Sequence, residues 1–201
     1  MQIAVISDTH MGTPPSWLDA VYARWLGPSD VLIHCGDITS TATWSYFLQH
    51  DNFLCVRGNC DWDPELAARL EPMLTAQVGG LTVGVTHGWG PRTQVPVKVA
   101  QAFGPDYDLV CYGHTHARDW SVVEGVRLIN PGSLGESGSL ALIHVDDHGG
   151  LRCDFVDAFY TASPRFPPFP CRPAPGENRP KNPARRLHFY FRNGMTQPWI
   201  K

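Results

Sequence analysis

Short apolar runs alternate with amphipathic segments in the first third of the chain. Three runs are continuous, apolar and rich in β-branched residues, as is typical of strands buried on both faces: 2–7, 30–34 and 53–56. Residues 17–26 place apolar side chains on one side and predict a helix, with Ser16 as its N-cap. A second helix is expected from a cap among 39–41 to about residue 50. This β-α-β-α-β order predicts a parallel sheet.

The pattern changes after residue 80, where short strand candidates follow one another with little helix between them. These candidates are 81–86, 109–112, 120–123, 126–129, 140–145 and 151–156. Only residues 95–103 predict a helix, and the segments 124–125 and 147–150 are typical of hairpin turns. A second sheet packed on the first would account for this number of strands.

Composition is that of a single globular domain. The chain has 201 residues, of which 43% are hydrophobic and 17% charged, and no apolar run approaches the ~20 residues of a membrane span. The N-terminus lacks the basic head and long apolar stretch of a signal peptide. Six cysteines without a C-x-x-C motif indicate reduced thiols. We therefore expect a cytoplasmic protein that does not contact a membrane.

The two ends of the chain differ in charge. Residues 1–163 hold eighteen acidic and eight basic residues, whereas residues 164–201 hold one acidic and eight basic residues. Eight of the twenty residues over 164–183 are proline, which disfavours an ordinary core element. We divide the chain into a domain over 1–157 and a Pro-rich basic extension over 158–201. The extension either lies on the acidic body of its own or a neighbouring subunit, which would favour a homo-oligomer, or contacts nucleic acid, or is a mobile extension.

Five polar motifs stand at the ends of apolar runs. They are Asp8-Thr9-His10, Gly36-Asp37, Gly58-Asn59-Cys60-Asp61, His87-Gly88 and Gly113-His114-Thr115-His116. The Asp-x-His and Gly-Asn motifs alone are ordinary turns more often than ligands, whereas Gly-His-Thr-His alone suggests a ligand site. Together the five motifs supply two aspartates, an asparagine and four histidines as candidate ligands. The carboxyl ends of strands in open α/β sheets are also where ligands bind. The joint pattern therefore predicts a site for two adjacent divalent metals.

The residue types indicate how two metals would share this set. Residues i and i+2 of an extended segment point to the same side, so Asp8 and His10 can aim at one place. Asp37 stands alone in the middle of the set and is the natural bridge. One histidine of the last motif would complete the ligands of the first metal. Asn59, His87 and the other histidine of that motif would complete those of the second. Mixed carboxylate, amide and imidazole ligands suit Mn²⁺ best, with Fe, Ni, Zn or Mg as alternatives.

In this order, the five motifs resemble those of the calcineurin-like metallophosphoesterase superfamily. Cys60 and the later segment Asn130-Pro131-Gly132-Ser133 are similar to its small prokaryotic phosphodiesterase branch. The resemblance implies an α/β fold, a four-layer α/β/β/α sandwich of two mixed sheets flanked by helices. It also implies a metal assignment: Asp8, His10, Asp37 and His116 on one metal, and Asp37, Asn59, His87 and His114 on the other.

The expected activity is hydrolysis of phosphodiesters, with phosphomonoesters as an alternative, by a hydroxide that bridges the two metals. Asp37, Asn59 and Cys60 are the predicted catalytic residues, and the substrate is a small phosphoester. A nucleotide pyrophosphatase, a nuclease or a non-catalytic protein-binding scaffold are the alternatives. The acidic body disfavours long nucleic acids.

Cys60 departs from the resemblance, because many superfamily members carry histidine there to protonate the leaving group. A thiol is a weak donor, so we expect a bias towards good leaving groups, unless Cys60 only fills space. Asp61 is expected to support the loop, or to orient a histidine from outside the ligand set, rather than to bind metal. Trp89, Arg92 and Lys98 either hold the substrate or belong to a solvated loop.

Overall fold

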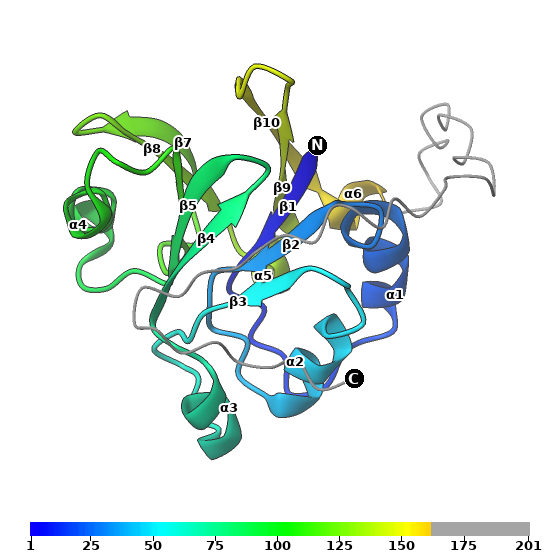
Figure 1. Cartoon of the computed structure of the whole chain (residues 1–201). Coiled ribbons are helices and arrows are strands. Elements are labelled where there is room, and N and C mark those ends of the chain that lie inside the picture. The colour runs from blue at the N-terminus through cyan, green and yellow to red at the C-terminus, as the bar shows by residue number, and fades with distance from the viewer. Residues whose placement is uncertain (162–201) are drawn as a thin grey trace.

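The computed structural model describes residues 1–161, with side chains through residue 159, and contains two five-stranded mixed sheets (Figure 1). The first sheet has the order β10-β9-β1-β2-β3. Its strands are β1 (Gln2–Ile6), β2 (Val31–His34), β3 (Phe53–Cys55), β9 (Ser139–Val145) and β10 (Leu151–Asp157). Strands β1, β2 and β3 are parallel, as the β-α-β-α-β pattern predicted, and β9 joins β1 antiparallel.

The second sheet has the order β4-β5-β6-β8-β7. Its strands are β4 (Met73–Val78), β5 (Leu81–Thr86), β6 (Leu109–Cys111), β7 (Arg118–Val123) and β8 (Val126–Pro131). The central strands β5, β6 and β8 are parallel, and the edge strands β4 and β7 pair antiparallel. The predicted second sheet is therefore confirmed, and the polar motifs follow parallel strands in both sheets.

The two sheets pack face to face, with helices outside them. Alternate residues of β1 show this: Ile3 and Val5 lie in the core between the sheets, whereas Ala4 and Ile6 pack towards the helices. Helices α1 (Trp17–Val21) and α2 (Thr41–Phe47) cover the first sheet, and α4 (Val95–Phe103) covers the second (Figure 1). A strand buried on both faces needs a continuous apolar run, which explains why β1 and β2 were predictable. The predicted two-sheet α/β fold is confirmed.

Helix ends differ from the prediction in two places. Ser16 does not cap the first helix, because its own backbone is helical (φ −60°) and its side chain accepts no hydrogen bond from the helix. The helical segment continues past α1 as a π-helical turn, Tyr22–Leu26. The second helix ends at Phe47 rather than near residue 50, and Ser40 caps it by accepting a hydrogen bond from the Thr43 backbone N–H.

The sequence prediction missed several short elements. Strand β4 forms a hairpin with β5 through Gly79 and Gly80, which both have positive φ. The other missed elements are α3 (Pro64–Arg69), the 3₁₀ turn η2 (Arg92–Gln94), α5 (Leu134–Ser137) and α6 (Ala158–Thr161). Helix α3 has a clear signal, since Asp63 caps it and Pro64 occupies the first turn.

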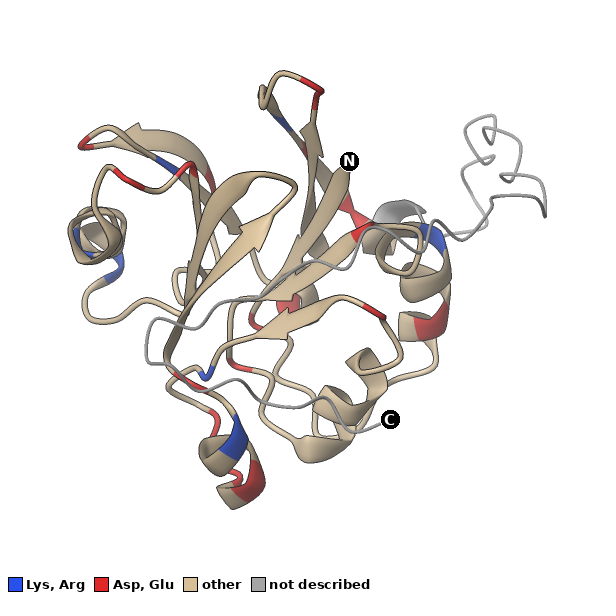
Figure 2. Ribbon diagram, in the orientation of Figure 1, with Lys and Arg blue, Asp and Glu red and all other residues tan. Residues whose placement is uncertain are grey.

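The extension predicted over 158–201 lies outside the described residues from residue 162 onward. Strand β10 ends at Asp157 and helix α6 (Ala158–Thr161) follows it directly, so the division at residue 157 stays a prediction. Acidic residues outnumber basic ones in the described part (Figure 2). None of the helices formed within residues 1–161 is long and apolar enough to cross a membrane. A role of the basic extension as a surface-bound arm, a nucleic-acid contact or a mobile segment stays a prediction.

Candidate metal centre

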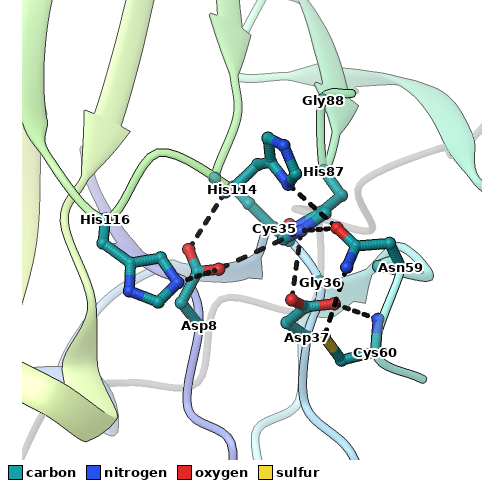
Figure 3. Close-up of polar contacts among 12 residues, drawn as sticks. Asp8, Cys35, Gly36, Asp37, Asn59, Cys60, His87, Gly88, His114 and His116 are labelled. Atoms are coloured by element: carbon teal, nitrogen blue, oxygen red, sulfur yellow. Dashed lines mark hydrogen bonds and ion pairs between the residues drawn. The ribbon is translucent and has the colours of Figure 1, made fainter. Parts of the chain in front are cut away.

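The seven predicted metal ligands converge at one rim of the sandwich, where parallel strands of both sheets end. Figure 3 labels all of them except His10. The first sheet supplies Asp8, His10, Asp37 and Asn59, from the segments that follow β1, β2 and β3. The second sheet supplies His87, His114 and His116, from the segments that follow β5 and β6. The structure thus brings together residues that are more than a hundred positions apart in the chain.

Asp8 is the centre of the first group of side chains. Its carboxylate is fully buried, and Oδ1 lies 3.2 Å from His116 Nε2 and 3.8 Å from His10 Nε2. Oδ2 accepts a hydrogen bond from the His114 backbone N–H, whereas Oδ1 accepts none. A buried carboxylate oxygen without a donor is unfavourable, and a cation beside it would remove that cost.

Asn59 is the centre of the second group. Its side-chain oxygen lies 3.1 Å from His87 Nε2 and 2.9 Å from His114 Nδ1. Asp37 lies between the two groups, because its Oδ2 is 3.3 Å from His87 Nε2 and 3.6 Å from His10 Nε2. This position between the groups is the one expected of a bridging carboxylate.

Three histidines are oriented by acceptors outside the centre. His87 Nδ1 lies 2.8 Å from the Cys35 carbonyl oxygen, and His114 Nε2 lies 2.9 Å from the Gly90 carbonyl oxygen. His116 Nδ1 lies 2.7 Å from Glu136 Oε2. Each acceptor takes an N–H, so in the neutral ring the other nitrogen presents its lone pair to the centre. Lone pairs that face carboxylate and amide oxygens need a cation or a proton between them, which is a good fit to metal binding.

The two aspartates differ in their ease of ionisation. Burial raises the pKa of Asp8. Burial also acts on Asp37, but hydrogen bonding and charge from His87 and a hydrogen bond from the Cys60 backbone N–H hold the pKa of Asp37 well below its usual value. Burial would lower the pKa of His87, yet Asp37 and Asp8 raise it above the ordinary value. A bound cation would displace such a proton, so metal affinity should fall in acid.

Backbone strain is concentrated at the ligands. Five of the seven have positive φ: Asp8 (52°), His10 (48°), Asp37 (57°), His114 (68°) and His116 (59°). Outside glycine, this left-handed region is uncommon and costs about 1–3 kcal/mol per residue. Gly36 also has a positive φ (91°). It has no room for a side chain, since a Cβ would stand 2.8 Å from the Gly58 nitrogen. The surrounding hydrogen bonds must therefore hold these turns in place.

Asp61 holds two of the ligand loops together. Its Oδ2 accepts hydrogen bonds from the backbone N–H groups of Gly58 (2.6 Å) and Asp37 (3.1 Å). Its Oδ1 accepts from the Thr39 N–H at 2.7 Å. The prediction that Asp61 supports the loop is confirmed. Asn130 acts similarly in the second sheet, because its side-chain amide donates to the Gly113 carbonyl oxygen at 2.7 Å.

Residues 1–148 match the family model of the calcineurin-like phosphoesterase superfamily domain. The chain belongs to this superfamily. A probable metallophosphoesterase of Bacillus subtilis, YsnB, is 32% identical over 136 residues, which are 67% of this chain and 75% of that protein. Phosphodiesterase MJ0936 of Methanocaldococcus jannaschii is 29% identical over 143 residues, 66% of this chain and 83% of that protein.

A solved structure also matches this phosphoesterase. The solution structure of protein TM1076 of Thermotoga maritima has a TM-score of 0.60 and 29% sequence identity, over 78% of this chain and 98% of that chain. The superfamily assignment and the fold thus agree. The metal assignment that the resemblance implied stays a prediction, with which the distances described above are compatible.

Glu136 is a residue of this phosphoesterase that the sequence analysis missed. It comes from α5, whose cap Ser133 donates its hydroxyl to the Asp8 carbonyl oxygen at 2.8 Å. The Gly135 N–H also donates to that oxygen, at 3.2 Å. The short helix therefore anchors the loop of Asp8 and places Glu136 against His116. No spacing rule reveals this pair, because His116 lies in the loop after β6 and Glu136 on helix α5.

Replacing Glu136 with glutamine should lower the metal affinity of the centre by about 10–100-fold, the usual effect of losing an outer carboxylate partner of a metal-binding histidine. The amide still accepts a hydrogen bond but no longer favours the imidazole by charge. Calorimetric titration of the metal-stripped protein with Mn²⁺ measures the change. Glu124→Gln, in the exposed turn between β7 and β8, is the matched control. Equal affinity of the Glu136 variant and the wild type would contradict the role.

Proposed function

We propose that this phosphoesterase hydrolyses phosphodiester bonds with two divalent cations, Mn²⁺ foremost. Asp8, His10 and His116 would hold one cation; Asn59, His87 and His114 would hold the other; Asp37 would bridge them. The observation that carries this proposal is Asp37 Oδ2, which faces histidines of both groups, beside the Asp8 oxygen that lacks a donor. Phosphomonoesters remain a second substrate class of the same site.

When bound, two such cations make hydroxide available near neutral pH and neutralise charge that develops on the phosphoryl oxygens. The role of the protein is to hold the metal ligands in positions that need no rearrangement during the reaction. Asp8, Asp37 and His87 are buried, whereas the side chains of His10 and His116 are 34% and 23% exposed. Asn59 is exposed as well, so the substrate can reach both groups of ligands from solvent.

The loop after β5 is the nearest source of further substrate contacts. Trp89 is 43% exposed and lies between His87 and Gly90, whose carbonyl oxygen orients His114. The Lys98 ammonium lies close to Gly90. A Cβ added to that glycine would stand 2.6 Å from Lys98 Nζ. An aromatic face and a cation beside the centre suit a small phosphodiester that carries an aromatic or heterocyclic group.

The test is metal removal and restoration on two reporters. The stripped protein should be inactive on bis(para-nitrophenyl) phosphate, and Mn²⁺ should restore hydrolysis, with a lower rate on para-nitrophenyl phosphate. A preference for the monoester would make the protein a phosphatase. If the metal-loaded protein hydrolysed neither reporter, this would contradict the proposal for these substrates and favour the protein-binding scaffold. Activity on a nucleotide pyrophosphate alone would favour the pyrophosphatase alternative.

A further inference from the structure

Cys60 lies at the edge of the metal centre with its sulfur towards the ligands (Figure 3). His10 Nε2, an Asp37 carboxylate oxygen and Cys60 Sγ are all within 4.8 Å of one another. Within residues 1–161, this is the one group of potential metal ligands that includes a cysteine. Tetrahedral ligands around zinc are separated by roughly 3.5 Å, given the usual metal–ligand lengths. A small inward movement of the side chains would therefore close this group around a cation.

Hydrogen bonds hold the sulfur in this position. The Cys60 backbone N–H donates to Asp37 Oδ1 at 2.7 Å, so the cysteine is tied to the bridging residue. The Asn59 side-chain amide donates to Cys60 Sγ at 3.2 Å. An amide donor of this kind stabilises a sulfur ligand that carries negative charge. Asp61 then joins the Gly58–Cys60 segment to the loop of Asp37, through the two N–H groups described above.

A second observation points to a cation at this place. Asp8 is completely buried, and its Oδ1 has no hydrogen-bond donor. That oxygen lies 3.8 Å from His10 Nε2, the same nitrogen that belongs to the Cys60 group. A cation near His10 would therefore satisfy the Asp8 oxygen and come within reach of the sulfur.

We propose that Cys60 is a metal ligand, which raises the affinity of the centre for thiophilic cations such as Zn²⁺ and Co²⁺, whereas Mn²⁺, the cation of the proposed reaction, gains least from the sulfur. Thiolate is a soft ligand that zinc and cobalt bind well and Mn²⁺ binds poorly. The thiol proton is released to solvent when the cation binds. The inference rests on the proposed function, because the cation is one that His10 and Asp37 would already hold. It adds an eighth ligand and a rule of metal selection.

The other described cysteines differ from Cys60. Cys35 and Cys111 are fully buried in the core between the sheets, and Cys55 packs against the core on the helix side of the first sheet. Cys153 lies on β10, packs against the same core and is partly exposed. Because Cys153 belongs to none of the potential ligand groups of the described residues, Cys153→Ser is a matched control for loss of one partly exposed thiol.

Cobalt titration of the metal-stripped full chain, without oxygen, tests the proposal. We expect visible d–d bands together with a near-ultraviolet sulfur-to-cobalt charge-transfer band in the wild type and in Cys153→Ser. Cys60→Ser and Cys60→Ala should keep the d–d bands and lose the charge-transfer band. Competition between Zn²⁺ and Mn²⁺ should show a zinc preference that falls roughly tenfold or more in the Cys60 variants.

The outcomes separate this proposal from the proposed function. Wild-type d–d bands without a charge-transfer band would overturn the ligand role of Cys60 and leave the metal centre intact. A charge-transfer band that survives in both Cys60 variants would assign the sulfur to another cysteine and would also overturn it. Absence of any cobalt binding would overturn the metal centre itself. Circular dichroism of each variant shows that a lost band does not reflect unfolding.

Discussion

Replacing Asp37 with asparagine should lower kcat/KM for a chromogenic phosphodiester by at least about 10³-fold, because two cations would lose their shared ligand. Oδ2 of Asp37 faces His10 and His87, and Oδ1 accepts the Cys60 N–H. An amide keeps the size of the side chain but offers only one ligand oxygen and no charge. Steady-state rates with saturating Mn²⁺, together with the metal content of the purified variant, measure the effect.

Asp147→Asn is the matched control for the Asp37 substitution. Asp147 lies in the exposed turn between β9 and β10, far along the chain from every proposed ligand, so its variant should retain wild-type kcat/KM. If Asp37→Asn hydrolysed the diester at the wild-type rate, Asp37 would not be the bridge. A loss of activity with two cations still bound at unchanged affinity would also contradict the argument, because the loss would then have another cause.

Replacing Cys60 with histidine should raise the rate on diesters with poor leaving groups by about 10²-fold and change the rate on good ones much less. An imidazole near the bridging residue can donate the proton that a departing alkoxide or phenoxide needs, and positioned acids contribute about 10²–10⁴-fold. Cys60 cannot, because a thiol is a weak hydrogen-bond donor and a cysteine that ligates a cation would carry no proton. Diphenyl phosphate and bis(para-nitrophenyl) phosphate are suitable poor and good substrates.

Cys60→Ser separates the gain of an imidazole from the loss of sulfur in this comparison. The serine variant should show no selective gain on diphenyl phosphate. Equal relative rates of wild type and Cys60→His on the two diesters would show that residue 60 does not take part in leaving-group protonation. It would then remain a space-filling side chain or a ligand only.

The parts of the fold that could be predicted are those whose burial requires a recognisable pattern of apolar residues in the sequence. Strands β1 and β2 are buried on both faces and therefore read as unbroken apolar runs. Strand β4 is exposed at alternate positions, and its polar Thr75 and Gln77 obscured it. Helix α5 has only four residues, too few for a helical period to be visible.

The candidate site was predictable in its membership but not in its geometry. Each ligand follows a strand, and parallel strands end at the same edge, so Asp8, Asp37 and Asn59 were expected to meet. The sequence contains no sign of the contact between His116 and Glu136, which depends on how helix α5 packs against the loop after β6. The left-handed backbone of His114 and His116 was equally hidden, because neither residue type requires it.

The strained backbone of the ligand turns has a consequence for how this protein changes over evolutionary time. At Asp8, Asp37 and three histidines, glycine would relieve local strain, so the present residues are poorer choices for folding alone. Only the demand for a working centre keeps them. In a lineage without selection for the metal centre, we expect substitutions to glycine or asparagine at these positions, while the apolar strands stay unchanged. The fold would then be retained after the activity is lost.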